Sequence, residues 1–185
     1  GDVYKRQELH FRDLAAAQQC HEAALKATPD DLAVLRSVER VLIARGDIFG
    51  AIANIEHQLD VLKDEGAAAG LLHELARIEA RHGGDLELAL DLLLAALDAQ
   101  PGHPGILADL VRTAEVARRP DMLLLGLEGE AEGLAESERA TPLVRASIVL
   151  REHRERNAAV ALLRAAALSR KDNFSLWRNL EELSM

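Results

Sequence analysis

Aromatic side chains and cysteine are scarce in this sequence of 185 residues. It contains three Phe, one Trp and one Tyr, although 49% of its residues are apolar. The apolar side chains are therefore mostly Ala and Leu, which are among the strongest helix formers. β-branched residues never form an alternating run, so no strand is predicted. A core this poor in aromatic rings requires helices that approach one another closely.

The sequence also lacks a long apolar run and a disulfide framework. Its longest apolar stretch, Leu86 to Leu97, is interrupted by Glu87 and Asp91 and is too short for a membrane span. Its single cysteine, Cys20, cannot form an internal disulfide, and no signal segment opens the chain. These features favour a cytoplasmic protein without a membrane segment.

Motifs for catalysis and metal binding are missing as well. The helix sequence His73-Glu74-Leu75-Ala76-Arg77 begins like a zinc-protease motif, but Arg77 occupies the place of the second His ligand. The seven His residues are widely spaced, and no CxxC pair occurs. Three glycines in an acidic stretch do not match a phosphate-binding loop; they are Gly126, Gly129 and Gly133. We therefore expect no enzymatic activity, no metal and no cofactor.

The charge of the chain is unevenly distributed. The net charge of −9 argues against nucleic acid as a partner, because phosphate binding needs a cationic surface. However, residues 121–138 hold six acids and no base, whereas residues 139–178 hold nine basic residues against three acids. A basic patch for nucleic acid or an acidic partner is one interpretation. Neighbouring helices with complementary faces are the favoured one, because no aromatic residues interleave with the basic ones for base stacking.

A motif of an acidic residue, an aliphatic residue and a small residue recurs along the chain. Asp13-Leu14-x-x-Ala17 returns 34 residues later as Asp47-Ile48-x-x-Ala51, and 38 residues after that as Asp85-Leu86-x-x-Ala89. A degenerate copy has Leu123 in the Ala position, and a last copy is centred on Ala159. Self-similarity at this period is typical of helical-hairpin repeats.

Each repeat contains two segments with the apolar spacing of a helix face. The first segments carry a large residue followed by apolar or small residues three, four and seven positions later: Leu35/Val38/Leu42, Leu72/Leu75-Ala76, Leu107/Leu110/Ala114 and Leu143/Ala146-Ser147/Leu150. The second segments carry a small residue, with a larger one four positions later: Ala17/His21/Ala24, Ala51/Ile55/Gln58, Ala89/Leu93/Ala96 and Ala159/Leu163/Ala166. Such small residues allow a partner helix to approach closely.

Turn residues separate these segments. Gly46-Asp47 and Gly84-Asp85 place Gly after one helix and Asp at the N-cap of the next. Pro29 and Pro101 follow the ends of second helices, and Thr141-Pro142 is expected to be an N-cap followed by a first-turn proline. A final first helix carries Trp177 in the large position and Leu180 three residues later.

On these residues the chain resembles the tetratricopeptide-repeat family over residues 8–185. The resemblance implies an all-α, right-handed superhelical solenoid of antiparallel helix pairs, with about four complete repeats and partial ends. Glu39 and Val111 depart from the pattern, since they stand where the family prefers Gly or Ala, and the Arg119-Pro120 unit lacks its small residue. Residues 1–7 (GDVYKRQ) resemble translated adaptor sequence and are expected to be a non-native leader of a fragment.

The resemblance implies that the first helices line a concave groove that binds a peptide or helix of a partner protein. Arginine stands five residues after the large residue of three successive first helices, at Arg40, Arg77 and Arg112. We call these three residues the arginine column. Residues one helical turn away from them extend the column; they are Arg36, His73 and Arg81. Because arginine forks bind carboxylates at two points, an acidic or C-terminal segment is the expected ligand.

Other interpretations of the column and of the chain stay open. The arginines could be solvated side chains, some paired with Glu39, Glu74 or Glu115. The chain could be a structural spacer of a larger protein, or a self-association module that docks through the helix containing Trp177. The family's chaperone-binding members clamp a terminal carboxylate with Lys and Asn, and Arg36 and Arg40 replace that pair here. Chaperone binding is therefore not expected.

Overall fold

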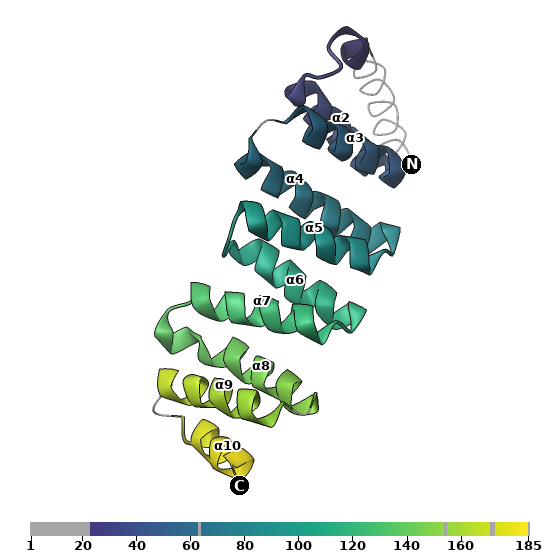
Figure 1. Ribbon diagram of the computed structural model, residues 1–185. Coiled ribbons are helices and arrows are strands. Elements are labelled where there is room, and N and C mark those ends of the chain that lie inside the picture. The colour runs from purple at the N-terminus through teal and green to yellow at the C-terminus, as the bar shows by residue number, and fades with distance from the viewer. Residues whose placement is uncertain (1–22, 63, 154, 171–172, 185) are drawn as a thin grey trace, which may run out of the picture. The chain divides into compact units, whose positions relative to one another are not determined.

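The computed structural model of the protein describes residues 23–62, 64–153, 155–170 and 173–184, and in these ranges it contains helices and turns but no strand (Figure 1). The chain divides into two compact units, residues 1–84 and 85–185. The predicted leader, the Asp13 motif and Cys20 lie outside the described residues.

In the first unit, helical residues 23–27 are followed by the α-helices α2 (Leu32–Arg45), α3 (Ile48–Val61) and α4 (Glu65–Ile78). A short π-helix, η1 (Glu79–Gly83), continues α4. Helix α3 packs against both α2 and α4. The main contacts between these helices are thus made with a neighbour in sequence, as in a repeat array.

The second unit is a stack of six α-helices, in which each helix packs against the next one in sequence. A 3₁₀ turn, η2 (Glu136–Glu138), joins α7 to α8 and also touches α9. The helices are α5 (Leu86–Ala99), α6 (Pro104–Ala117), α7 (Pro120–Gly133), α8 (Ala140–Glu152), α9 (Arg156–Ser169) and α10 (Phe174–Ser184). The predicted all-α helical-repeat solenoid is confirmed.

The predicted Gly-Asp turns are confirmed at both positions. Gly46 ends α2 with φ +73°, and Gly84 ends η1 with φ +75°. A Cβ would strain this left-handed conformation, which explains glycine at each turn. Asp47 accepts a hydrogen bond from the Gly50 N–H at 3.0 Å, and Asp85 accepts one from the Leu88 N–H at 3.0 Å. Each carboxylate therefore satisfies an amide that the helix leaves unpaired.

The predicted N-cap at Thr141 is wrong. Helix α8 begins at Ala140, and its N-cap position is Arg139, whose side chain makes no capping hydrogen bond. The 3₁₀ turn η2 ends at Glu138, and Arg139 already has helical backbone angles. The chain therefore enters α8 directly from this turn, and Thr141 lies inside the first helical turn. Pro142 does occupy that first turn, where its missing N–H costs little.

The repeat between Asp47 and Asp85 is longer than the first one, and its additional residues lie within helices. Sixteen residues separate Leu35 from Ala51, and sixteen separate Leu107 from Leu123, whereas seventeen separate Leu72 from Ala89. The π-helix η1 lies inside this longer interval and absorbs the additional residue, because a π turn contains one more residue per hydrogen-bonded ring than an α turn. Helix α4 also begins one turn further before its large residue than α2 does.

The buried residues of the second helices match the predicted small and large positions. All of these side chains are at most 2% exposed: Ala51, Ile55, Gln58, Ala89, Leu93, Ala96, Ala159, Leu163 and Ala166. In the first helices Leu35, Leu107 and Leu110 are at most 5% exposed, whereas the large residues Leu72 and Leu143 are half-buried. The period read from the sequence thus identifies the packed faces.

Gly126 explains one departure from the repeat pattern. Val111 of α6 is larger than the expected Gly or Ala, and Gly126 of α7 faces it. A Cβ at Gly126 would lie 2.7 Å from Val111 Cγ2, and a Cβ at Gly129 would lie 2.7 Å from Leu107 Cδ2. The unit that lacks its small residue at Leu123 therefore has small residues three and six positions later. Helices α6 and α7 stay close because α6 carries the larger side chain at this contact and α7 carries glycine.

A buried polar contact explains the other departure. Gln58 of α3 is 0% exposed, and its Nε2 donates to Glu39 of α2 at 2.6 Å and to Asn54 at 2.8 Å. Gln58 occupies the position of the buried alanines Ala96 and Ala166. Glu39 and Gln58 thus depart from the pattern together, and a hydrogen bond between them replaces close packing of small residues.

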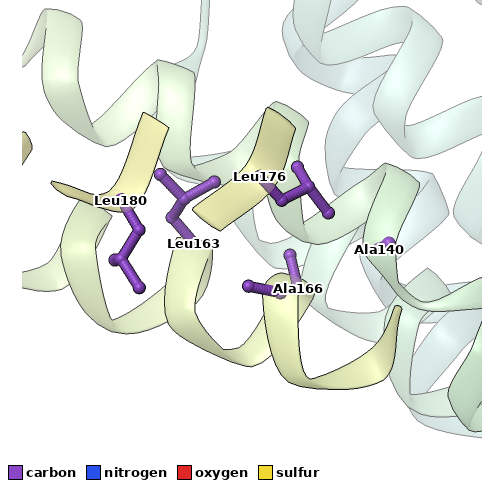
Figure 2. Packing of buried hydrophobic residues seen from close by; sticks show 6 residues of the cluster. Ala140, Leu163, Ala166, Leu176 and Leu180 are labelled. Carbon is purple, nitrogen blue, oxygen red and sulfur yellow. The ribbon is translucent and has the colours of Figure 1, made fainter. Parts of the chain in front are cut away.

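Trp177 contributes to a core cluster near the C-terminal end. The cluster contains Ala140, Leu163, Ala166, Ala167, Leu176 and Leu180, and Trp177 packs against it while half-buried. Figure 2 shows Leu176 and Leu180 of α10 against Leu163 and Ala166 of α9. Among the residues of α10 up to Glu182, the exposed side chains are polar apart from Phe174, which is 85% exposed. Self-association through the helix that contains Trp177 stays a prediction.

Gly126→Ala is expected to destabilise the chain by about 1 kcal/mol, because overpacking against Val111 outweighs the gain in helix propensity. Gly70→Ala is the matched control, since Gly70 lies in α4 and a Cβ added there would meet no other atom within 4 Å. This control should stabilise the chain by up to about 1 kcal/mol. Urea unfolding followed by circular dichroism measures both effects. Equal changes in the two midpoints would contradict the tight contact at Gly126.

Glu39→Ala and Gln58→Ala are expected to be coupled by about 1 kcal/mol, because each change removes the partner of the same hydrogen bond. The double variant should therefore lose less stability than the sum of the single variants. A double-mutant cycle in urea measures this difference. Glu56→Ala, at an exposed position of α3, replaces Glu39→Ala in the control cycle and should give additive effects with Gln58→Ala. Additivity in both cycles would refute the coupling.

Candidate functional site

Arg36 and Arg40 are one turn apart on α2, and both are exposed. Neither forms an ion pair or hydrogen bond with the described residues of the chain. Glu39, which the sequence offers as a partner, accepts its hydrogen bond from Gln58 instead. These two guanidinium groups therefore keep their donors available to a ligand.

The column residues predicted for the next repeat, His73, Arg77 and Arg81, lie on α4 and η1. His73 is half-buried, and Arg77 donates to Glu74 at 3.0 Å, with side chains 39% and 37% exposed. Arg81 is exposed but belongs to the π-helix η1. Its spacing of four from Arg77 is close to one turn of either helix type, so the two arginines lie on the same side of the helix.

Arg112 belongs to the second unit, where α6 places it on an exposed face. It forms an ion pair with Asp109, three residues earlier on the same helix, and Asp109 is only 15% exposed. Such intrahelical pairs contribute little to stability but hold the arginine along its own helix. Glu115, another partner considered from the sequence, pairs with Arg145 of α8 and not with Arg112.

The pair between Arg145 and Glu115 links two successive first helices, α8 and α6. Both side chains are partly exposed, at 42% and 47%. Neither residue belongs to the column predicted from the sequence. Their opposite charges are thirty residues apart, so only the stacking of α6, α7 and α8 brings them together.

Arg119 is a second charged link that the sequence did not reveal. At the N-cap of α7, it donates from Nε and Nη2 to the two carboxylate oxygens of Asp121, at 3.1 Å and 2.9 Å, and it also contacts Glu87 of α5. The hydrogen bond from Arg119 lowers the pKa of Asp121, and the same bond raises the pKa of Arg119. This link ties the turn between α6 and α7 to α5.

A cleft of about 410 Å³ lies between α8 and α10. Leu163 of α9 and Ser147 of α8 are its buried lining residues, and Ile148 is 41% exposed. The lining residues are Val144, Ser147, Ile148, Arg151, Leu163, Asn179 and Glu182. Three apolar side chains (Val144, Ile148 and Leu163) thus share this cleft with four polar or charged ones.

A larger cavity, of about 600 Å³, opens where α9, α10 and the turn before α8 meet. It includes the exposed side chains of Leu168 and Phe174. Within the ranges that the structure describes, no three His, Cys, Asp or Glu side chains gather as a metal site would require. In the same part of the chain, no helix is both long and apolar enough to cross a lipid bilayer.

The fold is similar to solved tetratricopeptide-repeat structures. MamA is 14% identical with a TM-score of 0.59, and the match covers 91% of this chain and 95% of MamA. YrrB, a TPR protein with an unusual peptide-binding site, is 14% identical with a TM-score of 0.58, over 95% of this chain and 88% of YrrB. A chain of the APC/C hetero-tetramer Cut9–Hcn1 is 13% identical with a TM-score of 0.51, over 95% of this chain and 34% of its own length.

These similarities confirm the fold predicted from the repeats. No protein-family model and no curated protein sequence matches the chain.

Asp121→Asn is expected to destabilise the chain near neutral pH and to have less effect in acid. The pKa of Asp121 is below its ordinary value of 3.8 in the folded chain, so its stabilising contribution is present above that value and is lost as the pH falls further. Urea unfolding of wild type and variant across this range measures the difference. Asp98→Asn, at an exposed position of α5, is the control and should show a smaller difference. A pH-independent effect of Asp121→Asn would contradict the ion pair.

Proposed function

We propose that this chain is a protein-interaction scaffold whose first helices bind an extended segment of a partner protein, with a preference for acidic segments. The observation that carries the proposal is the pair of exposed guanidinium groups on α2. Arg36 and Arg40 lie one turn apart and have no partner among the described residues, so a carboxylate can bind them at two points without first displacing an acid.

The other members of the arginine column support the proposal to different degrees. Arg77 and Arg112 are each engaged by an acid on their own helix, and their side chains are 39% and 63% exposed. A peptide carboxylate would compete with Glu74 or Asp109 for the guanidinium, but surface pairs of this kind are weak. His73 and Arg81 extend the same surface on α4 and η1.

The fold gives general support. Solved structures with this fold include a protein with an unusual peptide-binding site, and a helical-repeat surface offers an extended array of side chains to a partner. The net charge of −9 disfavours nucleic acid as the partner. The alternative is a structural spacer, which the intrahelical pairs of Arg77 and Arg112 favour, because these pairs neutralise two members of the column.

The test is a binding titration with an array of acidic and C-terminal peptides. The triple variant Arg40→Glu, Arg77→Glu, Arg112→Glu should lose at least about tenfold in affinity, because each change turns an attractive charge into a repulsive one. Binding to wild type should also weaken as salt rises.

The control variant carries the same change in net charge away from the first helices. Lys26→Glu, Arg164→Glu, Arg170→Glu alters three exposed basic residues, and its binding should resemble that of wild type. Circular dichroism must show that all three proteins are equally helical. If the two variants bind alike, the arginine column is a solvated surface and the spacer function is favoured.

A further inference from the structure

The cleft between α8 and α10 differs chemically from the arginine column. Five residues after the large residue, α6 carries Arg112, whereas α8 carries Ile148 in the equivalent position. Ile148 is 41% exposed, which is high for an isoleucine, and Val144 lies one turn before it. The surface that is charged on α6 therefore becomes apolar on α8.

The floor of the cleft belongs to the packed core. Leu163 of α9 is 2% exposed and is held between α8 and α10 by the cluster shown in Figure 2. Val144 packs on the same cluster. An apolar ligand group in the cleft would extend this core, and rigid surroundings reduce the entropic cost of binding it. A volume of about 410 Å³ accommodates one large side chain with adjoining peptide backbone.

Polar groups surround this apolar floor asymmetrically. Arg151 is on the α8 side, and Glu182 is on the α10 side. Neither forms an ion pair with the described residues, although both line the same cleft. Ser147 already donates to the Val144 carbonyl at 2.7 Å, whereas the Asn179 amide is exposed and can donate to and accept from a peptide backbone.

We propose that this cleft binds one large apolar side chain of a partner peptide, with an acidic residue next to that anchor bound by Arg151. The inference rests on the proposed function and names the motif that the second unit recognises. Burial of the anchor on Leu163, Val144 and Ile148 supplies the affinity. Arg151 attracts the neighbouring carboxylate, and Glu182 repels it from the α10 side, so the two charges together set the position of the acidic residue.

The experiment uses the whole chain and fluorescently labelled Gly/Ser peptides that carry a central Asp-Leu, Asp-Ser, Asn-Leu or Lys-Leu pair. Wild type should bind the Asp-Leu peptide at least about tenfold more tightly than the Asp-Ser and Lys-Leu peptides. Ile148→Ser should remove most of the preference for Leu over Ser. Val116→Ser is its control, because Val116 is 66% exposed on α6 and does not line the cleft.

The charge is tested by reversal. Arg151→Glu should lower the affinity for the Asp-Leu peptide about tenfold and should bind the Lys-Leu peptide more tightly than wild type does. Such a rescue cannot arise from misfolding. Arg164→Glu, on the exposed face of α9, is the control and should leave the affinity for both peptides unchanged.

The outcomes separate this inference from the proposed function. If peptides bind and the arginine-column variant abolishes binding, but Asp-Leu and Asp-Ser peptides bind equally, the cleft holds no anchor and the scaffold function stands. If Arg151→Glu leaves the Asp-Leu affinity unchanged, the assignment of the acidic neighbour is wrong. If no peptide binds wild type in either experiment, both proposals fail.

Discussion

Successive helices of this chain can bury their apolar faces only where a small side chain on one helix meets a larger one on the next. The sequence contains few aromatic rings to fill wider gaps, so the distance between helices is set by Ala, Gly and Leu. The contact between α6 and α7 demonstrates the constraint, because Val111 is accommodated only where Gly126 lacks a Cβ. Between α2 and α3 the same constraint is relieved differently, by a hydrogen bond between Glu39 and Gln58.

This packing decides which side chains remain for function. Most residues at the small and large positions are buried, and the positions five residues after each large residue on the first helices are exposed or half-exposed. The exposed positions carry arginines on α2, α4 and α6, and an isoleucine on α8. Ion pairs then divide the arginines into two groups. Arg36 and Arg40 have no partner in the described part of the chain, whereas Arg77 and Arg112 are held by acids on their own helices. The first helices therefore differ from one another in the charge that they offer to a partner.

Most of the fold could be predicted because repetition reveals helix faces. Each repeat must bury the same positions against its neighbours, so the spacing of Ala51, Ala89 and Ala159 marks the packed face before any coordinates are known. The Gly-Asp turns were predictable for a local reason, since Gly46 and Gly84 adopt positive φ and the following Asp caps the next helix. The start of α8 was not, because the 3₁₀ turn before it supplies a helical Arg139 and makes a cap at Thr141 unnecessary.

The sequence by itself determined the all-α class, the repeat period, the faces of the helices and the candidate arginines, because all of these depend on spacing along one chain. Tertiary structure alone decided which charges are engaged and where the surface is hollow. Arg145 and Glu115 are thirty residues apart, and the cleft takes its lining from α8, α9 and α10. The compensation of Val111 by Gly126 belongs to the same class of fact. Such features depend on distances between helices, and a single helical period carries no information about which residue of the next helix lies opposite.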